Sequence, residues 1–332
     1  MSFETINNGD TGLQVRNKLN ANFDIHIKDK EREAFEAATG GACTIERTAD
    51  GDAAHMFILP KMTWEDLVPS GELGTGVHEA FIEDGVEKSE LLIGMYQAAS
   101  MTGSGNSSTR LTSQPGLVPR RSINWDDSVS AAQAAGFGLM SNWEWSAIAF
   151  WCMANGFQPR GNTNSGKSHS HPHEQGRNVE YDSTETGSGP AAWRHNNAAQ
   201  GIADLVGNVW EWQWGFKMVD GRIFLAPDNY KARVESEWVD TEWDMPSASS
   251  SNWANFYNSE NEAPLDVRRA LIMPNGVADP DGSMWTNLEG ERFPTRGGAR
   301  FTAGAAGLGA LYLSYERTHV NATRGLRFSR LV

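Results

Sequence analysis

The sequence predicts an α+β protein. A pattern typical of an amphipathic helix covers Thr11 to Ala38, and two shorter helical segments follow at 125–135 and 141–154. Elsewhere, short apolar runs alternate with Gly-rich turns, which is typical of strands. From Asn155 onward the sequence has no long helical pattern. A few helices in the first half of the chain, together with short strands along the chain, predict this class.

The composition is that of a globular, acidic chain. It has 332 residues, 39% of them hydrophobic, which suffices for a large core. The formal net charge of −14 argues against nucleic acid or an anionic membrane surface as a partner, because both need clustered Lys and Arg. The sequence has neither a membrane-spanning apolar run nor a signal-peptide pattern at its start. We therefore expect no nucleic-acid partner, no membrane insertion and synthesis in a cytoplasm.

The N-terminal helical segment carries a narrow apolar stripe. A single helix with such a stripe must bury it against something, and copies of itself are one solution. We therefore expect residues 1–40 to form an attachment or oligomerisation helix and residues 41–332 to form one domain. The stripe consists of Leu13, Val15, Leu19, Phe23 and Ile27.

Local signals place the next elements. His55–Pro60 and Glu90–Tyr96 are apolar runs between turns and predict strands. Asn124 is an N-cap candidate for the helix at 125–135. Ser141 and Glu144 form a capping-box pattern, which predicts the start of the helix at 141–154.

A polar stretch in the middle of the chain matches the phosphate-binding loop pattern at residues 161–168. Such a loop needs a buried strand before it and a helix after it, and Pro172 excludes that helix. We therefore do not predict a nucleotide site. The alternating His169, His171 and His173 would share one face of a strand and converge on a transition metal. Because Pro172 interrupts them, we favour a solvated polar loop.

Tryptophans alternate with other residues between Gly201 and Gly215, as in a strand of period two. We interpret them as core residues beneath a sheet rather than as a ligand site. They are Trp210, Trp212 and Trp214.

Four motifs carry a family resemblance. They are "SNWEW" (141–145), "GNVWEW" (207–212), "RGG" (296–298) and the terminal "RGLRFSRLV" (324–332). Together, and in this order, they resemble the formylglycine-generating-enzyme-like (sulfatase-modifying-factor) branch of the C-type lectin fold. The similarity runs from about Ala53 to the C-terminus. It implies a C-type-lectin-like fold for residues 41–332.

The resemblance does not imply the enzymatic activity. In the enzymes of this branch, the region after "RGG" carries reactive cysteines that bind copper and oxidise a substrate cysteine. Here the stretch from Arg296 to Phe328 has no cysteine, and the chain's two cysteines are Cys43 and Cys152. Because thiolate chemistry needs a thiol at the site, we expect no enzyme, and an oxidase of this type is the least favoured alternative.

The same branch includes noncatalytic ligand-binding proteins diversified by retroelements, among them phage tropism determinants at tail-fibre tips. Their C-terminal segment is the binding face. Tyr, Arg and Ser on a rigid scaffold supply contact area and hydrogen bonds at low entropic cost. The alternative is that some of these side chains pack inward, Phe301 and Tyr312 foremost. The ligand-binding residues so implied are Arg300, Phe301, Thr302, Tyr312, Ser314, Tyr315, Glu316, His319 and Asn321.

In the enzyme relatives a calcium ion lies beside the "GNVWEW" strand. The resemblance puts Asn208 and Glu211 near such an ion, and oxygen ligands suit calcium. The alternative is that Glu211 caps a nearby loop.

The N-terminal stretch "INNGDTGLQVRNKLNANF" looks like the opening of many phage tail and fibre proteins, which anchor to the virion and commonly form trimers. With the lectin-like resemblance, it predicts a virion protein of the phage tail, made in the host cytoplasm and released by lysis. We expect it to bind a host cell-surface receptor, protein or glycan, to contact other virion proteins and to form a homotrimer. The alternative is a structural decoration of the collar or baseplate.

Overall fold

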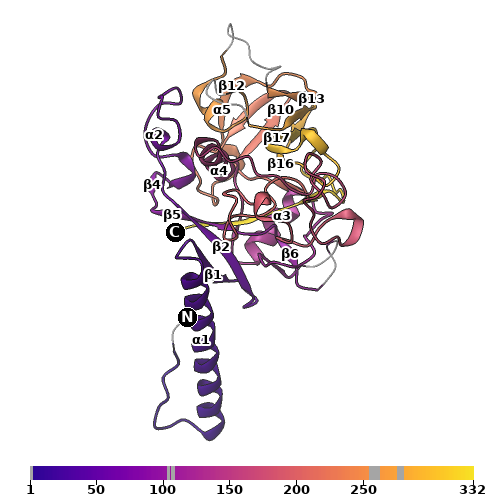
Figure 1. Ribbon diagram of the computed structural model, residues 1–332. Coiled ribbons are helices and arrows are strands. Elements are labelled where there is room, and N and C mark those ends of the chain that lie inside the picture. The colour runs from indigo at the N-terminus through magenta and orange to yellow at the C-terminus, as the bar shows by residue number, and fades with distance from the viewer. Residues whose placement is uncertain (1–2, 103–104, 106–108, 254–261, 275–279) are drawn as a thin grey trace.

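The N-terminal helix α1 (Gly12–Ala38) extends away from the rest of the protein (Figure 1). The structure is a computed structural model that describes residues 3–102, 105, 109–253, 262–274 and 280–332. The hydroxyl of Thr11 accepts a hydrogen bond from the amide of Gln14, and the Gln14 side chain accepts one from the Thr11 amide. This capping box starts the helix where the sequence predicts it.

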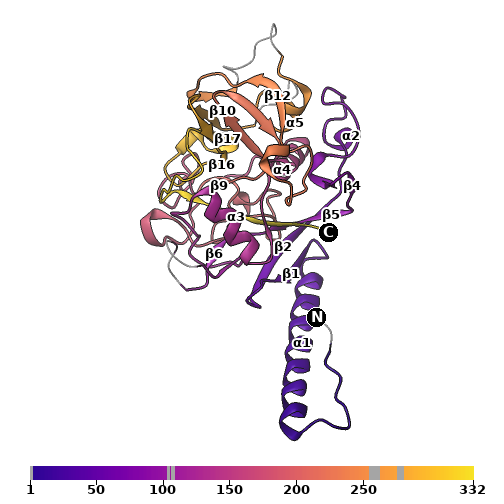
Figure 2. The same ribbon diagram turned by 180° about the vertical axis from the view of Figure 1, so that it is seen from behind.

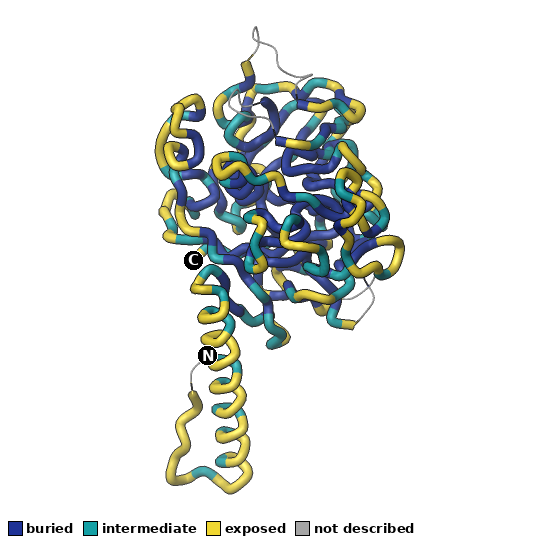
Figure 3. The backbone as a smooth tube through the Cα atoms, in the orientation of Figure 1, coloured by how far each residue is buried: buried dark blue, intermediate teal, exposed yellow. Residues whose placement is uncertain are grey.

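The apolar stripe of α1 faces solvent. No residue of α1 is buried, and Leu13, Phe23 and Ile27 are 65%, 64% and 61% exposed. Figure 3 shows this contrast between the exposed helix and the buried interior of the domain. The peptide before α1 folds back on the helix through polar contacts, including an ion pair of 2.8 Å between Lys18 and Asp10. Within the described chain, the stripe is therefore not buried, and self-association through it stays a prediction.

We expect the full-length protein to sediment as an oligomer and a variant that starts at Gly41 to sediment as a monomer. The physical reason is that packing α1 against copies of itself removes the exposed apolar stripe from water. Phe23→Glu should weaken the oligomer, whereas Lys30→Glu, a change at an exposed polar position of the same helix, should not. A monomeric full-length protein at micromolar concentration would contradict this prediction.

A five-stranded sheet joins the two ends of the domain. Its strand order is β1-β2-β5-β19-β8, so the C-terminal strand pairs between strands from the first half of the chain. Strands β2 and β5 confirm the two predicted early strands. The bounds are β1 Cys43–Arg47, β2 Ala53–Pro60, β5 Glu90–Gly94, β8 Gly138–Leu139 and β19 Phe328–Leu331.

A six-stranded sheet of order β13-β14-β17-β16-β9-β18 forms the other half of the domain, seen from behind in Figure 2. A four-stranded sheet, β12-β11-β10-β15, and the hairpins β3-β4 and β6-β7 complete the strands. In the six-stranded sheet the bounds are β9 Trp210–Trp212, β13 Ser249–Asn252, β14 Ser283–Thr286, β16 Thr295–Gly297, β17 Gly307–Leu313 and β18 Arg324–Gly325. The others are β3 Ile82–Glu83, β4 Val86–Glu87, β6 Ala99–Ser100, β7 Leu111–Thr112, β10 Phe216–Val219, β11 Arg222–Leu225, β12 Val239–Asp244 and β15 Glu291–Arg292.

Two helices of the domain begin at the predicted caps, Asn124 and Ser141. Asn124 accepts from the amide of Asp127 at 2.8 Å, and Ser141 with Glu144 forms the predicted capping box. Among the described residues after 155, the α-helical content is confined to the five-residue α5. The mixed helix and sheet content confirms the α+β class. The bounds are α2 Trp64–Leu67, α3 Trp125–Ala134, α4 Asn142–Ala154 and α5 Leu265–Arg269, with short 3-10 turns at Glu79–Phe81, Glu180–Asp182, Ala191–Trp193, Glu235–Glu237 and Ala303–Ala305.

The four sequence motifs meet in the core. Strand β9 of "GNVWEW" pairs with β16 of "RGG" and with β18 of the terminal motif. The guanidinium of Arg296 donates to the side-chain oxygen of Asn142 in "SNWEW" at 2.8 and 3.0 Å. Trp210, Trp212 and Trp214 are 4%, 0% and 5% exposed, which confirms that they are core residues. The described part of the chain holds no helix that is long and apolar enough to span a membrane.

Two buried histidines make the stability depend on pH. Burial lowers the pKa of His78 and of His195 from 6.5 to about 3, with smaller contributions from nearby arginines. The unfolded chain therefore binds protons that the folded protein cannot bind as the pH falls below about 6.5, and the loss of stability continues to about pH 3. We expect each histidine to cost roughly 2 kcal/mol of folding stability at about pH 5.

Denaturant unfolding at neutral pH and at mildly acidic pH measures this loss. His195 accepts a hydrogen bond through Nδ1 from the Ile202 amide at 2.8 Å, and the Asn side chain keeps an acceptor near that position. His195→Asn should therefore reduce the pH dependence, whereas His26→Asn on α1 should leave it unchanged. Equal stability at both pH values would contradict the prediction.

Candidate ligand-binding site

Four aromatic side chains are stacked along one side of the six-stranded sheet. We call Trp285, Tyr312, Tyr315 and His319 the aromatic row. Parallel pairing of β14 with β17 sets Trp285 opposite Tyr312. The successive ring centroids are 5.5, 4.9 and 3.6 Å apart, and all four side chains are half-buried. The row therefore presents ring edges on a rigid support rather than mobile side chains.

A buried arginine, Arg324, lies behind the aromatic row and contacts two of its rings. Arg324 is 3% exposed, and its guanidinium lies 4.7 Å from the ring centroid of Tyr312 and 4.5 Å from that of Tyr315. In the part of the chain that the structure describes, no carboxylate pairs with it. Burial lowers the pKa of Arg324 to about 10, and the two neighbouring tyrosines oppose this shift. The rings therefore supply the main electrostatic compensation for this charge.

A depression of about 490 Å³ opens at the end of the row. Arg292 lies in its lining, is 8% exposed and donates through Nη1 to the Glu316 carboxylate at 3.1 Å. Its Nε has no hydrogen-bond partner among the described residues. The Glu316 side chain is 67% exposed. The lining also includes Asn287, Ser314, Tyr315, Thr318 and His319.

The structure brings together part of the predicted binding face. Five of its residues lie in the aromatic row or the depression. Phe301 does not take part in these ring contacts. It is 58% exposed, with the Arg300 guanidinium 5.0 Å from its ring centroid. The five residues that gather are Tyr312, Ser314, Tyr315, Glu316 and His319.

Three other predicted residues bond to the protein's own backbone. Arg300 is 3% exposed and donates to the Ala322 carbonyl at 3.0 Å, so its prediction as an exposed residue was wrong. The Thr302 hydroxyl accepts from the amide of Ala299 at 2.8 Å. The side-chain oxygen of Asn321 accepts from the amide two residues later at 2.9 Å. These bonds fix the two loops. The alternative that a predicted side chain packs inward is correct for Arg300 but not for Phe301, which is exposed.

Sequence reasoning missed Trp285, Arg292 and Arg324 as site residues. Arg324 lies in the terminal motif, which was read only as a mark of the family. Trp285 and Arg292 lie on β14 and β15, outside the motifs, and only sheet pairing shows their position. A strand prediction with pairing partners would have found Trp285.

Asn208 and Glu211, the predicted calcium ligands, are both fully buried. The carboxylate of Glu211 accepts from Arg327 at 2.7 and 2.9 Å through its two oxygens. The side-chain oxygen of Asn208 accepts from the Thr184 amide at 2.9 Å, and its nitrogen donates to Gln97 at 3.0 Å. A calcium ion on Glu211 would have to displace a guanidinium that already supplies the positive charge, so these residues do not fit the ion.

We expect an excess of chelator to leave the melting temperature unchanged. A bound ion stabilises the folded state by mass action, and its removal would lower the melting temperature. The described residues contain no group of three or more His, Cys, Asp or Glu side chains placed to hold a metal ion. A fall of several degrees that added calcium reverses would restore Asn208 and Glu211 as ligands.

In the polar loop of residues 161–173, two of the histidines bond to neighbouring hydroxyl groups. The ring of His169 bonds the hydroxyl of Thr163 at 3.0 Å, and that of His171 bonds Ser170 at 3.0 Å. The rings of His171 and His173 are 5.8 Å apart, and no helix follows Lys167 in the described chain before residue 180. This agrees with the interpretation as a polar loop.

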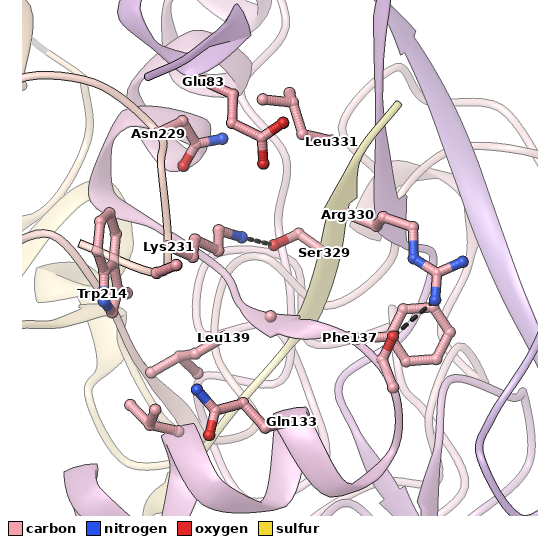
Figure 4. A pocket seen from close by; sticks show the side chains of 14 residues that line it. Glu83, Gln133, Phe137, Leu139, Trp214, Asn229, Lys231, Ser329, Arg330 and Leu331 are labelled. Carbon is pink, nitrogen blue, oxygen red and sulfur yellow. Dashed lines mark hydrogen bonds between the residues drawn. The ribbon is translucent and has the colours of Figure 1, made fainter.

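A second pocket, of about 320 Å³, lies between α3, β8 and β19 (Figure 4). At its centre Lys231 bonds Ser329 and forms an ion pair with Glu144 at 2.8 Å. Burial lowers the pKa of Lys231, and Glu144 opposes this shift. At the rim, Glu83 pairs with Lys88 and Arg330 with Glu46, both at 2.8 Å. The charges of this pocket are therefore satisfied within the protein.

Searches against known proteins find likenesses in structure alone. No family model and no curated protein matches the sequence. Solved structures similar to this chain include the Major Tropism Determinant I1 variant, at 15% identity and a TM-score of 0.34, over 84% of this chain and 56% of that one. Variable protein 1 of Treponema denticola is 11% identical with a TM-score of 0.40, over 87% of this chain and 99% of that one. PvdO of Pseudomonas aeruginosa is 16% identical with a TM-score of 0.41, over 87% of this chain and 98% of that one. The chain thus spans about half the length of the first structure. These values are too low to assign a family or a function.

Proposed function

We propose that this chain is a noncatalytic receptor-binding protein of a phage tail fibre or tail tip, in which residues 41–332 form a C-type-lectin-like domain. The observation that carries the proposal is the aromatic row, which is held by Arg324 and opens onto the depression at Arg292. Tyr, Trp and Arg dominate the binding energy of protein surfaces, and a rigid support lowers the entropic cost of using them. The row has the composition and the rigidity that such a surface needs.

The placement of α1 supports a division between attachment and binding. The helix leaves the domain beside β1, whereas β17 lies in the other half of the domain (Figure 1). An assembly through the stripe of α1 would leave the aromatic row free for a ligand. On this proposal, α1 contacts other virion proteins or copies of the chain in a trimer, and the protein reaches the virion from the host cytoplasm and leaves by lysis.

The meeting of the four motifs in the core supports the lectin-like assignment. "SNWEW" contacts "RGG" through Asn142 and Arg296, and "GNVWEW" contacts the terminal motif through Glu211 and Arg327. Residues that share a family pattern for reasons of folding are expected to contact one another in this way. Diversification of the C-terminal segment by a retroelement is part of the proposal, and an imperfect second copy of the gene's 3′ end beside a reverse transcriptase gene tests it.

The cysteines support a binding protein rather than an oxidase. Both are buried, and burial raises the pKa of Cys43 to about 11 and raises that of Cys152 as well. Neither thiol therefore ionises readily, and thiolates are the reactive species. Incubation with copper and a CxPxR peptide should yield no formylglycine by mass spectrometry.

Adsorption of the labelled full-length protein to host cells tests the proposed function. Specific, saturable binding that competes with phage adsorption is expected. A protein that binds purified virion components but not cells would instead be a collar or baseplate decoration. Competition is the deciding measurement, because nonspecific binding to cells does not block infection.

A further inference from the structure

We propose that the depression beside the aromatic row binds a sugar that bears a carboxylate, such as a uronic or sialic acid of a cell-surface glycan, with the carboxylate on the guanidinium of Arg292. The inference rests on the proposed receptor-binding function and names the chemistry of its ligand. It uses groups that the fold places together from β15, from the segment after β17 and from the connection after β14.

The lining of the depression matches a ligand rich in hydroxyls. Ser314, Tyr315 and Thr318 contribute hydroxyl groups, and Asn287 contributes an amide. Hydroxyls and amides both donate and accept hydrogen bonds, as a sugar requires of its site. The volume of about 490 Å³ falls in the range of small-molecule sites, which is roughly 300–1,000 Å³. One or two sugar rings are therefore a suitable size.

Arg292 supplies the acidic specificity. It is nearly buried, and in the described structure its guanidinium has one hydrogen-bond partner, the exposed Glu316, through Nη1 alone. A buried guanidinium is costly without a counter-charge, and a carboxylate that accepts two parallel bonds compensates it better than one single bond does. Without ligand, the Glu316 carboxylate thus occupies the position on Arg292 that the ligand's carboxylate would take. The exposed Glu316 side chain moves away when the ligand binds.

The charges around the depression agree with an acidic ligand. Arg324 lies under Tyr315, which is part of the lining, and it has no carboxylate partner among the described residues. Arg292 and Glu316 are the charged residues of the lining, and Arg324 adds a buried positive charge behind Tyr315.

The lining favours a sugar over a peptide. Val320 is the single aliphatic side chain among the lining residues. An aliphatic anchor of a peptide would therefore find little aliphatic surface in this lining. An acidic peptide is therefore the class that the test must exclude.

Titration calorimetry of the full-length protein with glucuronic acid and sialyllactose tests the inference, with glucose and lactose as their neutral counterparts. Only the acidic sugars should bind. Arg292→Gln should weaken their binding by about tenfold or more, because it removes charge-assisted hydrogen bonds. Glu316→Gln should strengthen it severalfold, because it removes the competing carboxylate. Tyr230→Ala, at a half-buried tyrosine on the loop after β11, should leave it unchanged.

Other outcomes overturn either the inference or the proposed function. Equal binding of neutral and acidic sugars would exclude the role of Arg292 in recognising a carboxylate. The same conclusion would follow if Arg292→Gln had the wild-type melting temperature and bound the acidic sugars as tightly as the wild type. Binding of hexaglutamate in place of the sugars would assign the site to an acidic protein. If no sugar binds but the protein still adsorbs to host cells, this inference fails and the proposed function stands. If the acidic sugars bind but host cells do not adsorb the protein, this inference stands and the proposed function fails.

Discussion

Glu211→Gln is expected to destabilise the domain by about 3–5 kcal/mol, since it leaves the buried guanidinium of Arg327 without its counter-charge. Both side chains are essentially inaccessible, at 1% and 0% exposure, and the shortest N–O distance of the pair is 2.7 Å. Arg327 also donates to the carbonyls of Gly94 and Ala203, so the pair connects β9 to the five-stranded sheet through β5, which ends at Gly94. Thermal or denaturant unfolding measures the loss.

Two further variants separate the pair from general damage to the core. Arg327→Met should cost a similar amount, and the double variant with Glu211→Leu should cost clearly less than the sum, because no unpaired charge remains. Lys30→Ala, which breaks an exposed pair on α1, should hardly change the melting temperature, because solvent screens such pairs. If the single variants unfold at the wild-type temperature, the ion pair does not hold the core and the calcium prediction becomes viable again.

Local signals in the sequence predicted the helices well. The predicted caps at Asn124 and Ser141 need only residues three positions away, so they can be read from a short window. Trp210, Trp212 and Trp214 were likewise assigned to the core from their period of two. These are features in which the neighbouring sequence determines the structure.

Features that depend on distant partners were predicted less well. The family resemblance put Glu211 near a calcium ion, and its partner Arg327 lies 116 residues further along the chain, so the local sequence does not show the pair. Arg300 was expected at the surface because its acceptor, the Ala322 carbonyl, belongs to another loop. Trp285 and Arg292 were missed because strand pairing brings them to the site. A carboxylate or a guanidinium in a sequence does not show whether its counter-charge comes from a ligand or from the protein itself.

The aromatic row gives the sharpest functional prediction. Tyr315→Ala is expected to reduce binding to host cells by roughly thirtyfold or more, which is the effect of losing one central anchor of at least about 2 kcal/mol. Tyr315 touches both neighbours in the row and lies over Arg324, so its loss also removes support for His319 and for the buried charge. Because the side chain is half-buried, the expected cost in stability is modest, about 1 kcal/mol.

Tyr230→Ala is the matched control for this prediction. Tyr230 is also half-buried and has a guanidinium, that of Arg233, 5.6 Å from its ring centroid, but it lies on the loop after β11 and outside the aromatic row. It should therefore lose a similar amount of stability and no binding. Paired melting and adsorption measurements on the two variants separate packing from recognition. Equal loss of adsorption in both variants, or unfolding of Tyr315→Ala at the assay temperature, would mean that the row supports the fold and that the receptor binds elsewhere.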